Sequence, residues 1–529
     1  MRTRILKMAL ILIAIGFPLL VNAQTSSLKA NWQNLDLKTD SAFGISTEKA
    51  YNELLKGKKH VPVLVAVIDE GVDINHEDLK SVIWTNPKEI AGNNIDDDKN
   101  GYVDDLHGWN FEGGPKGNVS YETYEYVRLI RFEKPKYENA DSTKLSAAEL
   151  IKYHEYLKMK AELNEGLKDA EANSARCILV GLQLDTLLID IKNKNPKVAD
   201  FKNFKPKNDF QKNEVNYALN IYKGNDYASD YRKELDEWQK NIQSERDYLL
   251  NINYDPRSIV GDNPNDDNEH YYGNNDVMGP DPLHGTHVAG IIGAVRNNNI
   301  GINGVANDVI IMAVRASLTN GDERDKDVAN AIRYAADNGA KVINMSFGKD
   351  YSWDKKVVDV AVKYAVSKDV LIIHAAGNEN ADRDKSEFYP NKIYEDGSGA
   401  ASSWIEVGAS HAADDENLKA YFSSYGKENV DVFAPGVNIY STTPNSTYTA
   451  ESGTSMASPV VAGLAALIRS YYPQLTAIQV KEIILNSVEK VNHEVYLSGK
   501  KSAKVPFSDL CKTSGIVNAY NALKLAATY

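Results

Sequence analysis

The chain has 529 residues, 43% of them hydrophobic and 25% charged, with a formal net charge of −13. This composition is ordinary for a soluble globular protein, and the length suggests roughly two to four domains. The acidic charge argues against a nucleic-acid-binding protein, because such proteins usually present a basic face. Cys177 and Cys511 are the two cysteines of the sequence. They exclude a disulfide framework, and we favour two free or buried thiols over a pair.

The N-terminus has the layout of a signal peptide. Residues 2–7 are rich in basic side chains, an apolar run follows to about Val21, and Ala23 provides a small residue for cleavage. We therefore expect residues 1–23 to direct export to the periplasm or the exterior, with no stable membrane insertion after cleavage. An uncleaved membrane anchor is the alternative.

A short extension, residues 24–60, precedes the first predicted strand and contains one amphipathic helix over Thr47–Lys56. Val61–Ile68 is apolar and β-branched on both faces, which is typical of a buried parallel strand. This strand delivers Asp69 at its C-terminal end, where catalytic groups of open α/β sheets gather. The alternative is that Asp69 only caps a turn or helix.

An acidic loop follows between Asn94 and Asp105. Asp96, Asp98 and Asn100 alternate along it, Gly101 allows a sharp turn, Tyr102 can offer its carbonyl, and Asp104 lies two residues further on. Alternating oxygen ligands before a glycine are typical of a calcium loop. The terminal glutamate of an EF-hand is missing, because His107 occupies its place. We predict a structural Ca²⁺ site here, with an acidic surface turn as the alternative.

Residues 115–250 differ in character and predict a helical insertion. They are rich in Lys, Glu, Asn and Tyr, and apolar residues recur at helical spacing over Ala147–Ala170. A long insertion in a surface loop is tolerated because loop-closure entropy grows slowly with length. It is interpreted either as a functional arm, such as a lid or a dimerisation element, or as a helical pack without a function.

Beyond a polar loop at Asp262–Pro282, His284 begins a run that becomes an apolar helix over Val288–Val295. Strands and helices then alternate, which predicts a parallel sheet with right-handed crossovers. The predicted strands are Val309–Val314, Lys341–Met345, Val370–Ala375, Trp404–Ala409 and Val430–Phe433, and the predicted helices are Asp325–Asn338, Asp354–Ser367 and Thr476–Val488.

The stretch Glu451–Arg469 opens with small polar residues and continues as an almost wholly apolar run. A helix that is apolar all round belongs in the core, and Pro459 is tolerable near its first turn. Ser455 is therefore expected at the N-terminal end of a buried helix. Free amides and the helix dipole favour negative charge there, which suits a nucleophile beside an oxyanion site. The alternative is that Ser455 caps the helix.

Four segments resemble the subtilisin family of serine peptidases. They are Val65–Asp69, His284–Gly290, Ala375–Asn378 and Gly453–Pro459, in the order Asp, His, Asn, Ser along the chain. The similarity covers about residues 61–112 and 255–529. It implies an α/β, subtilisin-like three-layer fold with a mostly parallel central sheet. The peptidase domain would be discontinuous, over 61–114 and 251–529, with the helical insertion between.

The resemblance also implies roles for individual residues. Asp69 would orient His284, His284 would act as the base, Ser455 would be the nucleophile, and Asn378 would stabilise the oxyanion. The segment Ser346, Phe347 and Gly348 resembles the one that pairs with the substrate backbone. Ala375, Ala376 and Gly377 resemble a wall of the specificity pocket, with ordinary turn packing as the alternative for both segments. His287 is expected to be a buried helix residue, and Glu70 stands where the family commonly has a small polar residue.

These residues together predict an exported serine endopeptidase acting through an Asp-His-Ser triad and an acyl-enzyme intermediate. It would act on protein or peptide substrates without an organic cofactor and without nucleic acid. One alternative is a specialised processing protease or transpeptidase whose insertion restricts access. Another is a catalytically silent binding protein on the same fold. The sequence does not indicate an oligomeric state.

Overall fold

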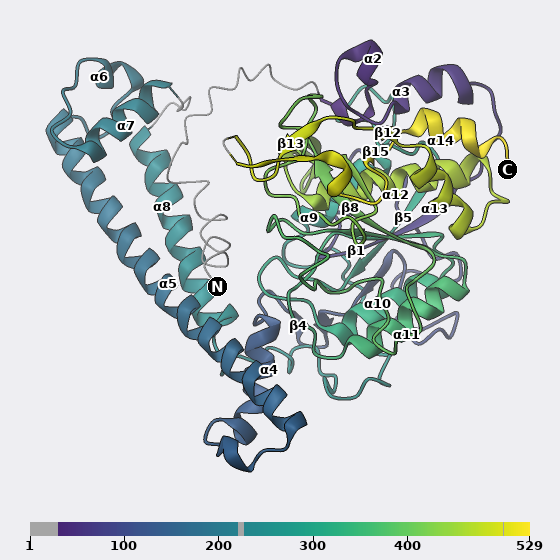
Figure 1. The fold of residues 1–529 in the computed structure, drawn as a ribbon, viewed down its shortest axis with the longest axis horizontal. Coiled ribbons are helices and arrows are strands. Elements are labelled where there is room, and N and C mark those ends of the chain that lie inside the picture. Colours follow the sequence, from purple (N-terminus) through teal and green to yellow (C-terminus); the bar gives the residue numbers. More distant parts are fainter. Residues whose placement is uncertain (1–29, 221–226, 501) are drawn as a thin grey trace. The chain divides into compact units, whose positions relative to one another are not determined.

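The computed structural model describes residues 30–220, 227–500 and 502–529 (Figure 1). The predicted signal peptide, residues 1–23, lies outside the described residues. Contacts within the chain separate two compact units, one of residues 126–254 and one of residues 30–125 with 255–529. The helical unit thus begins after the predicted position 115. Residues 115–125 pack in the larger unit, where Glu122 N donates to Asn320 O at 2.9 Å.

The larger unit is built on a nine-stranded sheet with the order β12-β15-β9-β8-β7-β6-β1-β5-β2. Every pairing is parallel except that of β12 with β15. The sheet is therefore mixed α/β and mostly parallel, as predicted from the alternation of strands and helices. Its strands are β1 (Val63–Asp69), β2 (Gly108–Asn110), β5 (Val309–Arg315), β6 (Val342–Met345), β7 (Leu371–Ala375), β8 (Trp404–Ser410), β9 (Val432–Pro435), β12 (Glu489–Lys490) and β15 (Gly515–Ile516).

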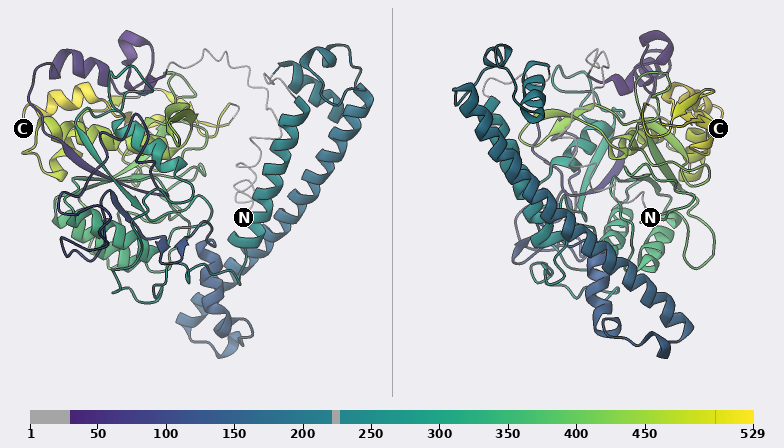
Figure 2. Two further views of the ribbon diagram at one scale, coloured as in Figure 1. Left: turned by 180° about the vertical axis from the view of Figure 1, so that it is seen from behind. Right: turned by 60° about the vertical axis from the view of Figure 1, so that its left-hand side comes forward.

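Helices cover both faces of this sheet, as the two views in Figure 2 show. Side chains alternate between the faces of a strand. In β1, Val65 and Val67 belong to the core cluster that contains residues of α9, α12, α13 and α14, whereas Ala66 and Ile68 belong to the cluster that contains residues of α10 and α11. β1 is thus buried on both sides, which explains its apolar sequence. The helices are α9 (Leu283–Gly293), α10 (Asp325–Asp337), α11 (Lys355–Ser367), α12 (Thr454–Tyr471), α13 (Ala477–Asn486) and α14 (Ala519–Ala526).

Shorter elements complete the larger unit. The predicted helix Thr47–Lys56 is α3 (Thr47–Ala50), which continues as the π-helical segment η3 (Tyr51–Leu55). The remaining elements are α2 (Leu37–Asp40), the 3₁₀ turns η2 (Trp32–Asn34) and η6 (Phe507–Asp509), and the paired strands β3 (Gly113–Gly114) with β4 (Gly117–Asn118), β10 (Ile439–Thr443) with β11 (Thr447–Glu451), and β13 (Glu494–Tyr496) with β14 (Lys504–Pro506).

The smaller unit is helical and is dominated by α5 (Ala147–Ile191), which extends well past the predicted end at Ala170. Ser146 and Glu149 form a reciprocal capping box that fixes where α5 begins. α5 packs against α8 in antiparallel fashion, since Ser174 bonds Gln239 and Cys177 bonds Leu235. The other elements are α4 (Glu125–Tyr137), η4 (Ser142–Lys144), α6 (Val198–Lys202), α7 (Asp209–Asn220), α8 (Tyr227–Ser244) and η5 (Glu245–Leu249).

Both cysteines are buried free thiols, Cys177 in the helical unit and Cys511 in the larger unit. Nowhere in residues 30–220, 227–500 and 502–529 does a helix have the length and apolarity needed to cross a bilayer.

The packing of α5 can be tested with two leucines on the same helix. Leu184 is fully buried, whereas Leu182 is 60% exposed. Leu184→Ala is expected to lower the local unfolding free energy by about 2–5 kcal/mol, because it leaves a cavity. Leu182→Ala should stay within about 0.5 kcal/mol. Hydrogen–deuterium exchange of α5 peptides in the full chain measures both changes, and equal effects would contradict the packing described.

Candidate active site

Asp69 and His284 are brought into direct contact at the carboxyl end of β1. Asp69 is 1% exposed, and its Oδ1 lies 2.8 Å from His284 Nδ1. Because a carboxylate can only accept, Nδ1 carries a proton, and in the neutral imidazole Nε2 is left as an acceptor. His284 is the second residue of α9, so that helix begins earlier than the predicted Val288. A contact of this kind holds an imidazole in one orientation and one tautomer.

Carboxylates surround His284. Burial alone would lower the pKa of His284, but Asp69, together with Glu70 and Glu451, outweighs it and raises the pKa to about 9. His287, one turn further along α9, behaves in the opposite way. Burial lowers the pKa of His287 to about 4, and its Nε2 lies 3.2 Å from Thr449 O. His287 is therefore a neutral buried helix residue near neutral pH, as the sequence suggested.

Ser455 is the second residue of α12, and the helix N-cap is Gly453. The interpretation of Ser455 as a helix cap is therefore wrong. Its Oγ donates to Ser346 O at 2.9 Å. Among the described residues this carbonyl, not His284, is the partner of the Ser455 hydroxyl. The side chain is half-buried and remains accessible at the surface.

A reciprocal contact with Ser346 holds Ser455 at the start of α12. Pro459 is the sixth residue of the helix, beyond the first turn, and has no N–H to donate to Ser455 O. Ser346 Oγ supplies the missing donor at 3.0 Å. Ser346 Oγ in turn accepts from Asn344 Nδ2 at 2.9 Å and lies 2.8 Å from Ser458 Oγ. The proline thus frees a carbonyl that ties the helix start to the end of β6.

Asn378 faces the same helix start from the loop after β7. Its Oδ1 accepts from Thr454 N at 2.9 Å and from Thr454 Oγ1 at 3.0 Å. Occupying the amide oxygen in this way leaves Nδ2 as the group that faces outward. A methyl group placed on Gly453 would lie 3.5 Å from Asn378 Nδ2 and 3.5 Å from Ser455 N. Two N–H donors therefore border one small space that the glycine leaves open, an arrangement suited to an oxyanion.

The predicted substrate-binding segments follow β6 and β7. Ser346 contacts Ser455 as described, and a Cβ on Gly348 would meet the Phe388 ring at 2.4 Å. Gly377 has a φ of 95° and donates its N–H to Thr454 Oγ1 at 3.2 Å. Ala375 and Ala376 are both buried. Tight backbone packing explains the glycines at these positions, and Thr454 links the Gly377 segment to α12.

A second buried histidine, which the sequence did not reveal, supports Phe347. His374 Nε2 lies 2.9 Å from Phe347 O, and Nδ1 lies 2.9 Å from Glu406 Oε1. Glu406 also accepts from Trp404 Nε1 at 2.9 Å. Both ring nitrogens of His374 therefore have polar partners in the core. The backbone carbonyl of Phe347 is thus held by a polar contact with a buried side chain.

The carboxylates of the acidic loop fall into two groups, one that gathers at a candidate metal site and one that bonds to the backbone of the turn. Asp96 and Asp98 come together with Glu89, with candidate ligand atoms within 4.8 Å of one another. Asp104 instead accepts from Gly92 N at 3.0 Å and from Asn94 N at 2.8 Å, so its carboxylate shapes the turn. Glu89, seven residues before Asp96, is a candidate ligand that the search within the loop missed.

The predicted ligand Asn100 has partners in the protein, and one of them is the N–H of Tyr102, whose carbonyl is the other predicted ligand. Asn100 Oδ1 accepts from Tyr102 N at 2.8 Å, and Asn100 Nδ2 donates to Asp105 Oδ2 at 3.0 Å. Glu89 Oε2, by contrast, is buried without a hydrogen-bond partner among the described residues. A hard cation with oxygen ligands would satisfy that atom, so the donor set fits calcium.

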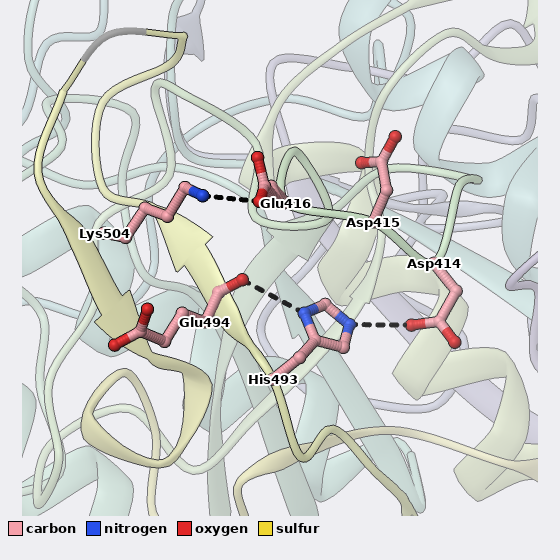
Figure 3. Close-up of a pocket in the computed structure, with 6 residues that line it drawn as sticks. All are labelled: Asp414, Asp415, Glu416, His493, Glu494 and Lys504. Atoms are coloured by element: carbon pink, nitrogen blue, oxygen red, sulfur yellow. Dashed lines mark hydrogen bonds and ion pairs between the residues drawn. The ribbon is translucent and has the colours of Figure 1, made fainter.

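A separate pocket of about 330 Å³ lies between the loop after β8 and the β13–β14 hairpin (Figure 3). His493 bridges Asp414 Oδ1 at 2.9 Å and Glu494 O at 3.1 Å, and Lys504 pairs with Glu416. None of the residues predicted to act in catalysis, substrate binding or metal binding lines it. Its lining residues are Asp414, Asp415, Glu416, His493, Glu494 and Lys504.

Several known proteases are similar to this chain in sequence. Thermophilic serine proteinase of Bacillus sp. (strain AK1) is 43% identical over 209 residues, which are 40% of this chain and 47% of that protein. Thermitase of Thermoactinomyces vulgaris is 39% identical over 242 residues, 46% of this chain and 75% of that protein. Subtilisin E of Bacillus subtilis (strain 168) is 40% identical over 214 residues, 40% of this chain and 52% of that protein. The chain therefore spans about half the length of two of these three relatives.

A solved protease structure from Pseudoalteromonas arctica PAMC 21717 is 28% identical, has a TM-score of 0.39, and is matched over 48% of this chain and 78% of that chain. A family model described as the subtilase family, Peptidase S8, matches residues 62–504. The family model and the sequence relatives support a serine-type peptidase. Because the family model extends over most of the sequence, the chain belongs to the subtilase family.

Proposed function

We propose that the chain is an exported serine endopeptidase that hydrolyses peptide bonds through Asp69, His284 and Ser455. The observation that carries this proposal is the 2.8 Å contact of Asp69 with His284, together with the donors that border Gly453. A base with a fixed tautomer and a preorganised oxyanion site are the two features that acyl transfer needs most. Export rests on the signal-peptide layout of residues 1–23.

Acylation begins with the serine hydroxyl. Ser455 Oγ leaves Ser346 O and turns toward His284 Nε2, which takes its proton as Oγ attacks the carbonyl carbon. Asp69 stabilises the imidazolium that forms. The oxygen of the tetrahedral intermediate is stabilised by Asn378 Nδ2 and Ser455 N. When the C–N bond breaks, His284 gives the proton to the leaving amine.

Deacylation repeats these steps with water. His284 Nε2 takes a proton from a water molecule whose oxygen attacks the acyl carbon. The bond to Ser455 Oγ then breaks, and His284 returns the proton to the serine. The acid product leaves, and the enzyme returns to its starting state. No organic cofactor takes part in either half of this reaction.

We propose in addition that Glu89, Asp96 and Asp98 hold a structural calcium ion. Such an ion would neutralise three neighbouring carboxylates and would fix the acidic loop. Lys88 Nζ lies 3.7 Å from Asp98 Oδ2 and only partly offsets their charge.

The nucleophile can be tested with a fluorophosphonate probe, which reacts only with an activated serine. The wild-type protein should label and should digest an unfolded protein substrate. Ser455→Ala should lose both activities, whereas Ser452→Ala, which changes an exposed serine three residues earlier, should keep them. Labelling that persists in Ser455→Ala would refute the assignment. Folded wild-type protein that does not label would favour a silent binding protein.

The calcium site can be tested by calorimetry and thermal unfolding. Calcium at 100 times its Kd should stabilise the fold by about 2.7 kcal/mol, because it binds only the folded state. Glu89→Gln should weaken this binding. Glu416→Gln removes a carboxylate of the separate pocket and serves as the control. A Tm that does not respond to a chelator, or equal responses in the two variants, would exclude the site.

A further inference from the structure

Glu70 is a buried carboxylate placed against the backbone of His284. It is 6% exposed and follows Asp69 at the end of β1. Its Oε1 accepts from His284 N at 2.7 Å, and its Oε2 accepts from Thr319 Oγ1 at 2.6 Å. Its backbone oxygen accepts from Arg315 Nε at 2.8 Å. The first two contacts hold the carboxylate in one orientation, and the third holds the backbone of Glu70.

Helix α9 needs this carboxylate for its first turn. The amides at a helix start have no partners within the helix, and the dipole there favours negative charge. The N-cap residue, Pro282, makes no side-chain capping bond. Glu70 satisfies the His284 amide instead, from a different element. Asp69 therefore fixes the imidazole of His284, and Glu70 fixes its backbone.

We propose that Glu70 is a positioning residue for the base His284, and that its charge shifts the activity of the enzyme toward alkaline pH. The argument rests on the proposed function, in which His284 must be neutral to accept the Ser455 proton. Any negative charge beside the imidazole favours the protonated, inactive form. A small polar residue at position 70 would lack that effect. The same side chain thus holds the backbone of His284 in place and sets the pH range in which His284 is neutral.

The charged groups around the two side chains come from several elements. His284 faces Asp69 at the end of β1, Glu70 directly after it, Glu451 from β11 and neutral His287 from its own helix. Glu70 faces Asp69 and His284, and Arg315 from β5 bonds its backbone. The Thr319 hydroxyl that binds Glu70 also lies 3.3 Å from Asp281 Oδ2. Carboxylates outnumber cations in this environment.

The ionisation of Glu70 and that of His284 are linked. Burial raises the pKa of Glu70 to about 7, the His284 charge opposes this rise, and the Asp69 charge adds to it. Above this pH Glu70 is charged and His284 keeps its proton until about pH 9. The neutral base therefore accumulates only as the pH becomes alkaline. The acid limb of kcat/KM should reflect this coupled pair.

The test compares Glu70→Gln with Glu70→Ala. Glutamine keeps an oxygen that accepts from His284 N but removes the charge, so the acid limb of kcat/KM should move to lower pH by about 1 pH unit. Glu70→Ala removes both the charge and the acceptor. Its acid limb should therefore move as well, and its kcat/KM at alkaline pH should be lower than that of Glu70→Gln. An acid limb that coincides with that of the wild type in both variants would overturn the proposal.

Two further experiments, an NMR titration and a second variant, separate the role of Glu70 from loss of activity and from loss of folding. NMR titration of His284 reports the charge effect without any turnover, so it separates this proposal from the proposed function. If the wild type is inactive, the function fails, while the His284 titration in Glu70→Gln still decides the role of Glu70. If Glu70→Gln does not fold, Thr319→Val removes the hydroxyl that stabilises the carboxylate. The acid limb of Thr319→Val should then move in the same direction by a smaller amount, and no movement would count against Glu70.

Discussion

The contact between Asp69 and His284 is the interaction on which the site depends, and it joins residues 215 positions apart. It forms because β1 lies between β5 and β6 in the sheet and α9 begins where β1 ends. Burial of β1 on both faces fixes the position of Asp69. The serine and the amide come to the same edge, because β6 and β7 end there and α12 packs across β6, β7 and β8.

A helical unit of residues 126–254 lies within this 215-residue separation. Ion pairs hold the two segments of the larger unit that precede and follow it. On one side, Arg324 donates to Glu122 Oε2 at 2.8 Å, and Lys349 lies 3.3 Å from Glu125. On the other, Arg257 binds Asp327 at 2.6 Å. Such buried charges are costly unless they are paired. Both connections are therefore fixed within the larger unit, which lets Asp69 and His284 meet although the helical unit lies between them in the sequence.

Much of the fold could be predicted because its elements carry strong periodic patterns. β1 was recognisable from its continuous apolar run, and α10 and α11 from residues at helical spacing. The change to a π-helix at Tyr51 and the full length of α5 were not predictable, because tertiary packing decides where such helices continue. The smaller unit begins later than position 115, because residues 122–125 bond to the loop at 320–324, a contact that no local pattern encodes.

In the candidate site, too, local sequence patterns were predictable and contacts between distant residues were not. Asp69, His284, Asn378 and Ser455 could be selected because they stand in distinctive segments. Their supporting contacts could not, since each joins distant parts of the chain. Thr454 orients Asn378, and Ser346 replaces the donor that Pro459 lacks. Glu89 joins the acidic loop from outside it.

The most direct test of the account is a crystal structure of the protein after reaction with a phosphonate. We expect phosphorus bonded to Ser455 Oγ, with the Ser346 contact of that oxygen lost. One phosphonyl oxygen should lie within hydrogen-bonding distance of both Asn378 Nδ2 and Ser455 N, in the space beside Gly453. A phosphonyl oxygen directed away from both donors, or phosphorus bonded to a different residue, would contradict the account.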